Sequence, residues 1–193
     1  PVPDPFFVLA TQNPIESEGV YALPEAQLDR FIFKLVVDYP SAADEEEIVR
    51  RMASDPPRAR QLLDPAQIIA LQKQADEVFV DHRVRTYAVQ LVTATRNPAE
   101  VGLPELEPYL ELGGSPRASL SLIRGARALA VMRGRGYVLP EDVHALYHDA
   151  LRHRVVLSYE ALAAEVRPEQ VLDRILAHVP QPQVEIGAGH NVA

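Results

Sequence analysis

The sequence predicts a mainly α-helical protein in which a bundle of helices follows two short strands. Unbroken apolar runs at residues 6–10 and 31–37 have the length and the aromatic and β-branched content of strands that are covered on both faces. From residue 41 to about residue 176, apolar residues instead recur at the spacing of amphipathic helices. A chain of 193 residues, 47% of them hydrophobic, is long enough to bury a core.

The first predicted strand is followed by Asn13 and Pro14, where an apolar run gives way to polar residues. Pro14 biases Asn13 towards an extended backbone. The carboxyl end of a strand is where open α/β sheets bind ligands, and an amide there can hold a water or a phosphate oxygen. Alternatively, Asn-Pro merely starts a turn. A short helix is expected over residues 24–30, because Pro24 fits a first helical turn.

Six longer helices are expected after the second strand. Ser41 can cap the first of them, whose acidic first turn complements the helix dipole. The apolar stripes of the six are Ile48, Val49 and Met52; Ile68, Leu71, Ala75 and Val78; Val84, Tyr87, Ala88, Leu91 and Val92; Leu122, Ile123, Ala126, Leu129 and Ala130; Val143, Leu146, Tyr147, Ala150 and Leu151; and Val171, Leu172, Ile175 and Leu176. The tail after Pro180 has no periodicity and is expected to be loose.

Two arginines occupy unusual places. Arg30 ends the short predicted helix, and a salt bridge to Asp29 is unfavourable because adjacent helical residues do not face each other. Arg117 falls in the first turn of a helix that Ser115 caps and Pro116 begins, where a cation opposes the helix dipole. An anionic partner such as phosphate would explain this placement. The alternative for both residues is an ordinary surface charge.

Composition argues against several classes of function. A net charge of −8 opposes non-specific binding of nucleic acid. A basic cluster could nevertheless contact nucleic acid, a nucleotide or a neighbouring subunit; it comprises Arg117, Arg124, Arg127, Arg133 and Arg135. His144 and His148 lack a third ligand, so no metal site is predicted. No apolar run approaches the roughly 20 residues of a membrane-spanning helix, and the absence of cysteine is compatible with the cytoplasmic location that we expect.

Two blocks of the chain resemble the MoxR family of AAA+ ATPases. Residues 10–31, ATQNPIESEGVYALPEAQLDRF, are similar to the family's segment from sensor 1 to the arginine finger. Residues 113–143, GGSPRASLSLIRGARALAVMRGRGYVLPEDV, are similar to its sensor 2 helix and the segment directly after that helix. The resemblance spans about residues 2–182. It implies that Asn13 is sensor 1, which orients the attacking water or reads the γ-phosphate of ATP, that Arg30 is the finger reaching a neighbour's nucleotide, and that Arg117 is sensor 2, contacting its own subunit's ATP.

The resemblance also divides the chain. Residues 1–38 would be the last strands of an α/β P-loop ATPase core, residues 39–180 an α-helical lid, and residues 181–193 a loose tail. The sequence contains no G-x-x-x-x-G-K-[ST] and no apolar strand ending in Asp-Glu, the Walker A and B signatures that hold phosphate and metal. The chain also begins without Met. We therefore expect the C-terminal part of a longer bacterial protein, which alone should not hydrolyse ATP.

The resemblance further implies what the longer protein does. It would bind ATP and Mg²⁺ and hydrolyse ATP as a homo-oligomeric, hexameric ring. The family is associated with chaperone-like maturation of client protein complexes, including metal-cofactor insertion and methanol dehydrogenase activation, and von Willebrand factor A-domain proteins are candidate partners. The alternative is a non-catalytic helical protein-interaction module. A third possibility is nucleic-acid binding through the arginine cluster, which would be steeply salt-dependent.

Overall fold

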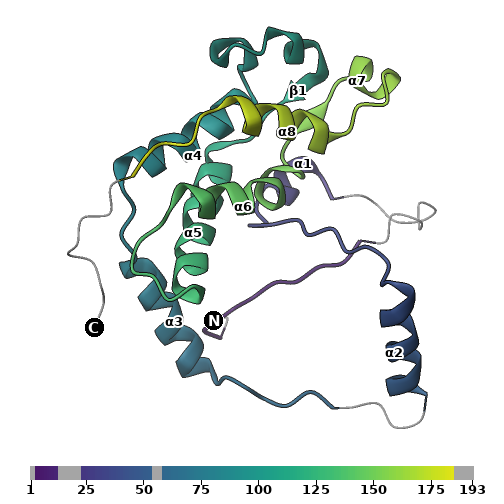
Figure 1. Cartoon of the computed structure of the whole chain (residues 1–193), viewed down its shortest axis with the longest axis vertical. Helices are drawn as coiled ribbons and strands as arrows, with labels where there is room; N and C mark the ends of the chain where they lie inside the picture. The colour runs from purple at the N-terminus through teal and green to yellow at the C-terminus, as the bar shows by residue number, and fades with distance from the viewer. Residues whose placement is uncertain (1–2, 13–22, 54–57, 185–193) are drawn as a thin grey trace.

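A computed structural model describes residues 3–12, 23–53 and 58–184 of the chain. Its main body is a helical bundle, which confirms the mainly α fold class (Figure 1). Helix α5 (Pro116–Met132) packs against α3 (Pro65–Glu77), α4 (His82–Ala94) and α6 (Pro140–Leu151). Helix α8 (Pro168–His178) lies against α4 and α6. The periodic apolar stripes thus locate all of these helices.

Side-chain caps fix where several helices begin. The Ser41 hydroxyl accepts from the Asp44 amide at the start of α2 (Ala42–Met52), and Ser115 caps α5 with Pro116 in its first position, both as predicted. Asp64 and the side chain of Gln67 form a capping box at the start of α3. These caps satisfy amides that would otherwise lack intrahelical partners.

The core lies where the stripes of α4, α5, α6 and α8 meet. Every residue of the stripe predicted for α4 is buried, and Leu122, Tyr147 and Ile175 bring the other helices into the same cluster. Helix α3 is less buried than these helices, because its N-terminal end extends beyond the bundle (Figure 1). Val78, just after α3, is buried, whereas Leu71 in the middle of the helix stays 42% exposed.

The two strands predicted at residues 6–10 and 31–37 are not formed. Both segments run without strand pairing, and Phe7 and Val37 are 80% and 90% exposed. A strand is held by hydrogen bonds to a neighbouring strand, and within the described residues none lies beside either segment. The sheet that does form was not predicted: β1 (Leu110–Leu112) pairs antiparallel with β2 (Val156–Leu157).

Short elements connect the helices. The short predicted helix appears as α1 (Glu25–Leu28), and three connectors were not predicted: the 3₁₀ helices η1 (Pro98–Val101) and η2 (Pro104–Tyr109), and α7 (Tyr159–Ala163). Gly102 ends η1 with φ +85°, a left-handed backbone that favours glycine. A Cβ at Gly102 would also come within 3.1 Å of His178 Nε2, so α8 approaches the connector closely.

A fully buried carboxylate holds the loop between α5 and α6. Asp142 accepts from Arg133 Nη1 at 2.8 Å, from Arg135 Nη2 at 2.6 Å and from the Leu139 amide at 2.9 Å. Breaking such a buried pair by removing one partner costs about 3–5 kcal/mol. The predicted basic cluster is therefore divided, since two of its five arginines bind an internal carboxylate. This division does not favour nucleic-acid binding through the cluster.

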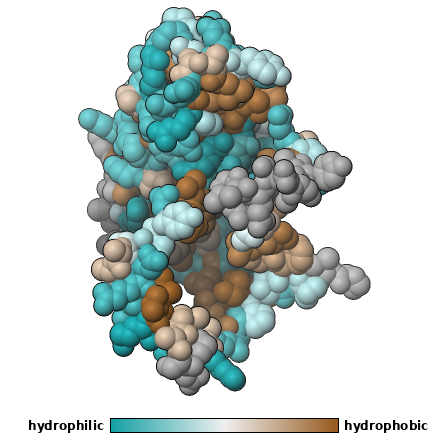
Figure 2. Space-filling model, turned by 90° about the vertical axis from the view of Figure 1, so that its right-hand side faces the viewer, coloured by the Kyte–Doolittle hydropathy of each residue, from teal (hydrophilic) through white to brown (hydrophobic). Residues whose placement is uncertain are grey.

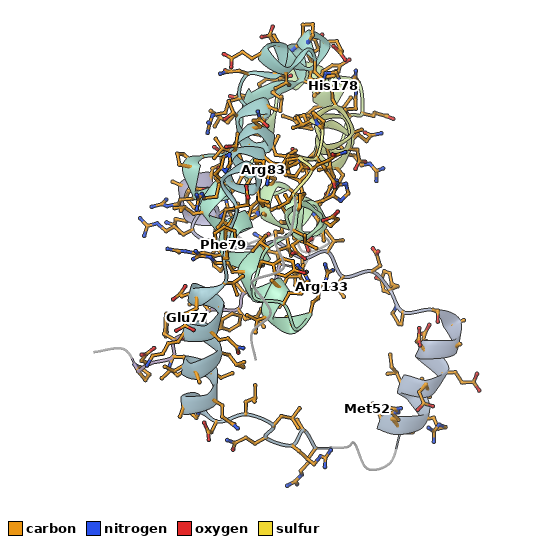
Figure 3. All side chains as sticks on the ribbon, turned by 60° about the vertical axis from the view of Figure 1, so that its left-hand side comes forward. Met52, Glu77, Phe79, Arg83, Arg133 and His178 are labelled. Atoms are coloured by element: carbon orange, nitrogen blue, oxygen red, sulfur yellow. The ribbon has the colours of Figure 1, made fainter. Side chains whose placement is uncertain are left out.

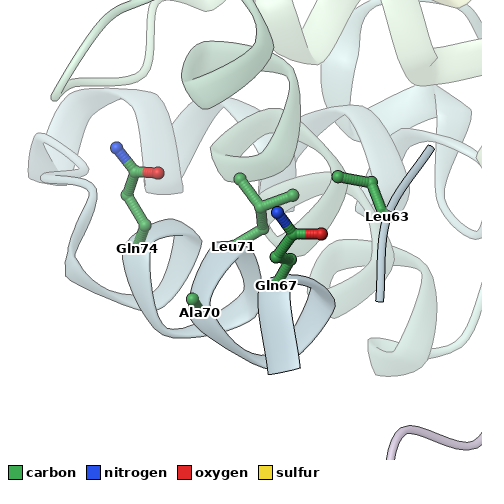
Figure 4. A pocket seen from close by; sticks show the side chains of 5 residues that line it. All are labelled: Leu63, Gln67, Ala70, Leu71 and Gln74. Atoms are coloured by element: carbon green, nitrogen blue, oxygen red, sulfur yellow. The ribbon is translucent and has the colours of Figure 1, made fainter. Parts of the chain in front are cut away.

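Apolar side chains remain exposed outside the bundle. Helix α2 stands apart from it, with Met52 at its far end (Figures 1 and 3). Ile48, Val49 and Met52 on α2 are all about half exposed or more, and several apolar patches are visible on the face in Figure 2. A shallow hollow of about 300 Å³ lies on α3, lined by Leu63, Gln67, Ala70, Leu71 and Gln74 (Figure 4). Within the described residues, no helix is long and apolar enough to cross a membrane.

Candidate functional site

Asp29, which follows α1, is the residue where the N-terminal segment meets the bundle. Its carboxylate accepts from the Ser115 hydroxyl at 2.9 and 3.0 Å and from Arg154 Nε at 2.9 Å. Arg117 Nη1 lies 3.4 Å from Asp29 Oδ2, at the long end of hydrogen-bonding distance. One carboxylate therefore joins the end of α1, the start of α5 and the turn after α6.

The Ser115 hydroxyl has two tasks at this point. Its oxygen accepts from the Arg117 amide at 3.1 Å, which caps α5, while its proton is donated to Asp29. A hydroxyl can donate and accept at the same time. The carboxylate of Asp29 is thus placed near the positive end of the α5 dipole, where a negative charge is stabilising.

Arg154 clamps the segment around Asp29 onto the bundle. Its side chain is only 2% exposed. Besides the Asp29 carboxylate, its Nη2 donates to the main-chain oxygens of Asp29 at 3.0 Å and Phe31 at 2.7 Å and to Ser121 Oγ at 3.0 Å. Its Nη1 donates to the oxygens of Ile32, at 3.3 Å, and Ala150. The planar fork of arginine suits such a set of acceptors.

Further contacts extend the attachment towards residue 34. The Lys34 amide donates to the main-chain oxygen of Asp149 at 2.8 Å, and Arg152 Nη1 donates to the main-chain oxygen of Lys34 at 3.1 Å. Phe33 packs so closely on α5 that a Cβ at Gly125 would lie 2.5 Å from its ring. The glycine leaves the space that the phenyl ring needs. Residues 29–34 are therefore docked on the bundle even though they form no strand.

The electrostatics favour an ionised Asp29. Partial burial opposes the charge, but the hydrogen bonds from Ser115 and Arg154, the charge of Arg154 and the bond from Arg117 outweigh it, so the pKa of Asp29 lies below its ordinary value. The carboxylate therefore stays charged near neutral pH. Its attraction for the three donors is lost only in acid, as the pH falls through that lowered pKa.

The predicted site residues fall into two groups. Asn13, the predicted sensor 1, lies outside the described residues. Arg30 and Arg117 are both exposed; Arg117 forms an ion pair with Asp29, and Arg30 is the next residue in the chain after Asp29. Cations presented together at a surface can bind a phosphate group. Asp29 and Arg154 were not predicted as members of this site, because their partners are more than 80 residues away in the sequence.

Comparisons with known proteins match both parts of the chain. The model described as the AAA lid domain matches residues 105–175, and the model of the ATPase family associated with various cellular activities matches residues 1–33. Over its whole length the chain is 50% identical to Chaperone MoxR1 of Mycobacterium tuberculosis, covering 52% of that protein. The chain belongs to the MoxR family of AAA+ ATPases.

Two further comparisons agree with this assignment. Protein MoxR of Paracoccus denitrificans is 32% identical, with 91% of this chain and 56% of that protein covered. The crystal structure of a Cytophaga hutchinsonii protein assigned as an ATPase is 38% identical and superposes with a TM-score of 0.89, covering 95% of this chain and 56% of that one. The MoxR-family chain thus spans about half the length of the relatives it matches.

The two histidines weighed as metal ligands are separated in this MoxR-family lid. His148 Nε2 lies 2.8 Å from Asp173 Oδ1 and so links α6 to α8, while His144 is exposed. Among the described residues, no group of three or more metal-ligating side chains gathers.

His153, beside the Arg154 clamp, makes the docked segment sensitive to pH. Its Nε2 lies 3.1 Å from the Phe31 oxygen, so the neutral ring must carry its proton on Nε2, and the buried Nδ1 has no hydrogen-bond partner in the described structure. Burial lowers the pKa of His153 below 6.5; the bond to Phe31 and Asp29 oppose this shift, while Arg154 and Lys34 add to it. His153 therefore binds a proton less readily in the folded protein than in the unfolded chain.

We expect the contribution of His153 to the free energy of unfolding to be fully present above about pH 6.5 and to be lost as the pH falls from there through the lowered pKa, with a slope of at most about 1.4 kcal/mol per pH unit. Urea unfolding at several pH values measures the slope. His153→Gln should flatten it, because glutamine retains an N–H donor without titrating. Exposed His144→Gln is the matched control, and an equal effect of both variants would contradict the assignment.

Proposed function

We propose that this chain supplies the phosphate-sensing residues and the helical lid of an ATPase that works as a ring. Membership of the MoxR family supports ATP as the substrate. The observation that carries the proposal is that exposed Arg117 forms an ion pair with Asp29, the residue directly before exposed Arg30. Phosphoryl transfer is catalysed mainly by positioning and by stabilising charge, and two arginines presented together suit that task.

The proposed roles agree with the resemblance in part. Asn13 would orient the attacking water, and Arg30 would reach the nucleotide of a neighbouring subunit. The resemblance alone assigns Arg117 to its own subunit's ATP. We infer instead that both arginines serve the same, neighbouring nucleotide, because Arg117 forms an ion pair with Asp29, the residue directly before Arg30. Mg²⁺ and most phosphate contacts would come from Walker motifs in the part of the protein outside this chain.

The wider function is proposed on the same basis. We propose that residues 1–38 complete an ATPase core, that residues 39–180 form its lid, and that the ring is a cytoplasmic hexamer. The name of the 50% identical relative, Chaperone MoxR1, supports a chaperone that remodels client protein complexes. Metal-cofactor insertion, methanol dehydrogenase activation and von Willebrand factor A-domain partners remain candidates for the client step.

Substitution of Asn13 tests the proposal. In the full-length protein, Asn13→Ala should lower turnover of ATP by about 10²–10³-fold, as expected on loss of a donor that acts in the transition state. The affinity for ATP should change little. Steady-state hydrolysis and equilibrium binding measure the two effects separately, with Gln12→Ala as a neighbouring control. A large loss of affinity at unchanged turnover would contradict the role, and a wild-type protein without ATPase activity would favour the interaction module.

A further inference from the structure

The ion pair between Asp29 and Arg117 needs an explanation, because the carboxylate competes with phosphate for that arginine. Asp29 adjoins Arg30 in sequence and pairs with Arg117 in space. Resting on the function proposed above, we propose that Asp29 is a positioning residue. It fastens the turn that carries Arg30 to the end of α5 that carries Arg117, so that the two arginines are presented to a phosphate as one unit.

Helix α1 contributes little to holding the turn at Arg30. Helix α1 has only four residues and none of them is buried. A helix of that length is not stable alone, since nucleation costs more than so few hydrogen bonds return. The direction in which Arg30 leaves the surface must therefore be set by contacts at the C-terminal end of α1. Those contacts comprise the main-chain bonds that Arg154 makes to residues 29, 31 and 32 and the side-chain bonds of Ser115 and Arg154 to Asp29. Among the three residues that Arg154 binds here, only Asp29 also takes part through its side chain.

The three donors around Asp29 are not equivalent. Arg154 is buried and tied to main-chain oxygens, and Ser115 is fixed as the cap of α5, so both hold Asp29 from rigid positions. Arg117 is 55% exposed and makes the longest contact, at 3.4 Å. Exposed ion pairs contribute little, typically below about 1 kcal/mol. Arg117 can therefore leave Asp29 for a phosphate while Ser115 and Arg154 keep the turn in place.

The spacing between α1 and α5 gives a direct readout that does not depend on ATP hydrolysis. The chain has no cysteine, so Gln27→Cys and Leu120→Cys, at exposed positions on α1 and α5, can be spin-labelled specifically. Pulsed electron paramagnetic resonance should give one narrow distance distribution. Asp29→Asn should broaden it, whereas Asp76→Asn, at an exposed position on α3, should leave it unchanged.

A matched pair at Ser115 separates this attachment from helix capping. Asparagine and aspartate both cap helices well. Only asparagine has an N–H that can replace the hydroxyl donor to Asp29, whereas aspartate places a second negative charge against it. We expect Ser115→Asn to keep the narrow distribution and Ser115→Asp to broaden it, although α5 remains capped in both.

In the full-length ring, Asp29→Asn and Ser115→Asp should lower the turnover of ATP on the order of 10²-fold, as misplacement of a catalytic group does, with little change in KM. Ser115→Asn should retain turnover. Unchanged distances in Asp29→Asn, or disturbed distances with normal turnover, would overturn the proposal. Normal turnover in Arg30→Ala would instead refute the proposed function, while the distances would still decide whether Asp29 fixes the turn.

Discussion

Arg30→Ala rings should bind ATP with near-normal affinity and lose on the order of 10³–10⁵-fold in turnover, the range attributed to an arginine that stabilises transferring phosphoryl charge. Arg30 is exposed, and the structure gives its side chain no hydrogen bond or ion pair within the described residues, so its removal should leave the fold intact. Single-turnover hydrolysis and nucleotide binding measure the two quantities.

Arg124 supplies the control for Arg30. It is also an exposed arginine, placed on α5, and is not part of the Asp29 cluster. Arg124→Ala removes the same charge from the chain and should retain turnover. If both variants lost activity equally, a general effect of charge would explain the result better than a specific contact with ATP.

Mixed rings should reveal which subunit's nucleotide each arginine serves. Subunits with Arg30→Ala would be combined with subunits whose ATP-binding loop has been inactivated. The first kind keeps a working pocket and the second keeps Arg30, so one order of neighbours rebuilds a complete site. Hydrolysis should partly return. Because Arg117 forms an ion pair with Asp29, the residue directly before Arg30, we expect Arg117→Ala subunits to be rescued in the same way.

Rescue of Arg30→Ala without rescue of Arg117→Ala would restore the assignment that the family resemblance suggests, in which Arg117 contacts its own subunit's ATP. Wild-type subunits mixed with the same inactivated partner set the scale, since they show how much hydrolysis a ring with silent sites retains. Each rescue is judged against that value at the same mixing ratio.

The helices could be predicted from the sequence because their signals are local. A stripe such as Val84, Tyr87 and Leu91 recurs at the helical period, and Ser115 with Pro116 marks a helix start within two residues. The β1–β2 pair gave no such signal, because Leu110 and Leu157 are far apart in sequence and each strand is very short. The 3₁₀ segments around Pro98 and Pro104 likewise lack the length over which a period can be recognised.

The candidate site was only partly predictable for the same reason. Arg30 and Arg117 were found from their unusual local positions and from the family's motifs. The sequence argument that Asp29 would not pair with Arg30 agrees with the structure, but it could not identify Arg154 as the partner, 125 residues away. The basic cluster is not a single surface, because Arg117 binds the part-buried carboxylate of Asp29, whereas Arg135 binds buried Asp142.

The clamp at Arg154 has a consequence for how this region can vary between related proteins. Its Nη atoms bind the carbonyl oxygens of Phe31 and Ile32, which any amino acid at those positions would provide. The side chains of residues 31 and 32 are therefore free to change without loosening these bonds. Arg154 itself has no such freedom, because lysine offers a single ammonium where a planar fork is needed. Tolerance of substitution should thus be uneven across the contact, broad at residues 31 and 32 and narrow at Arg154.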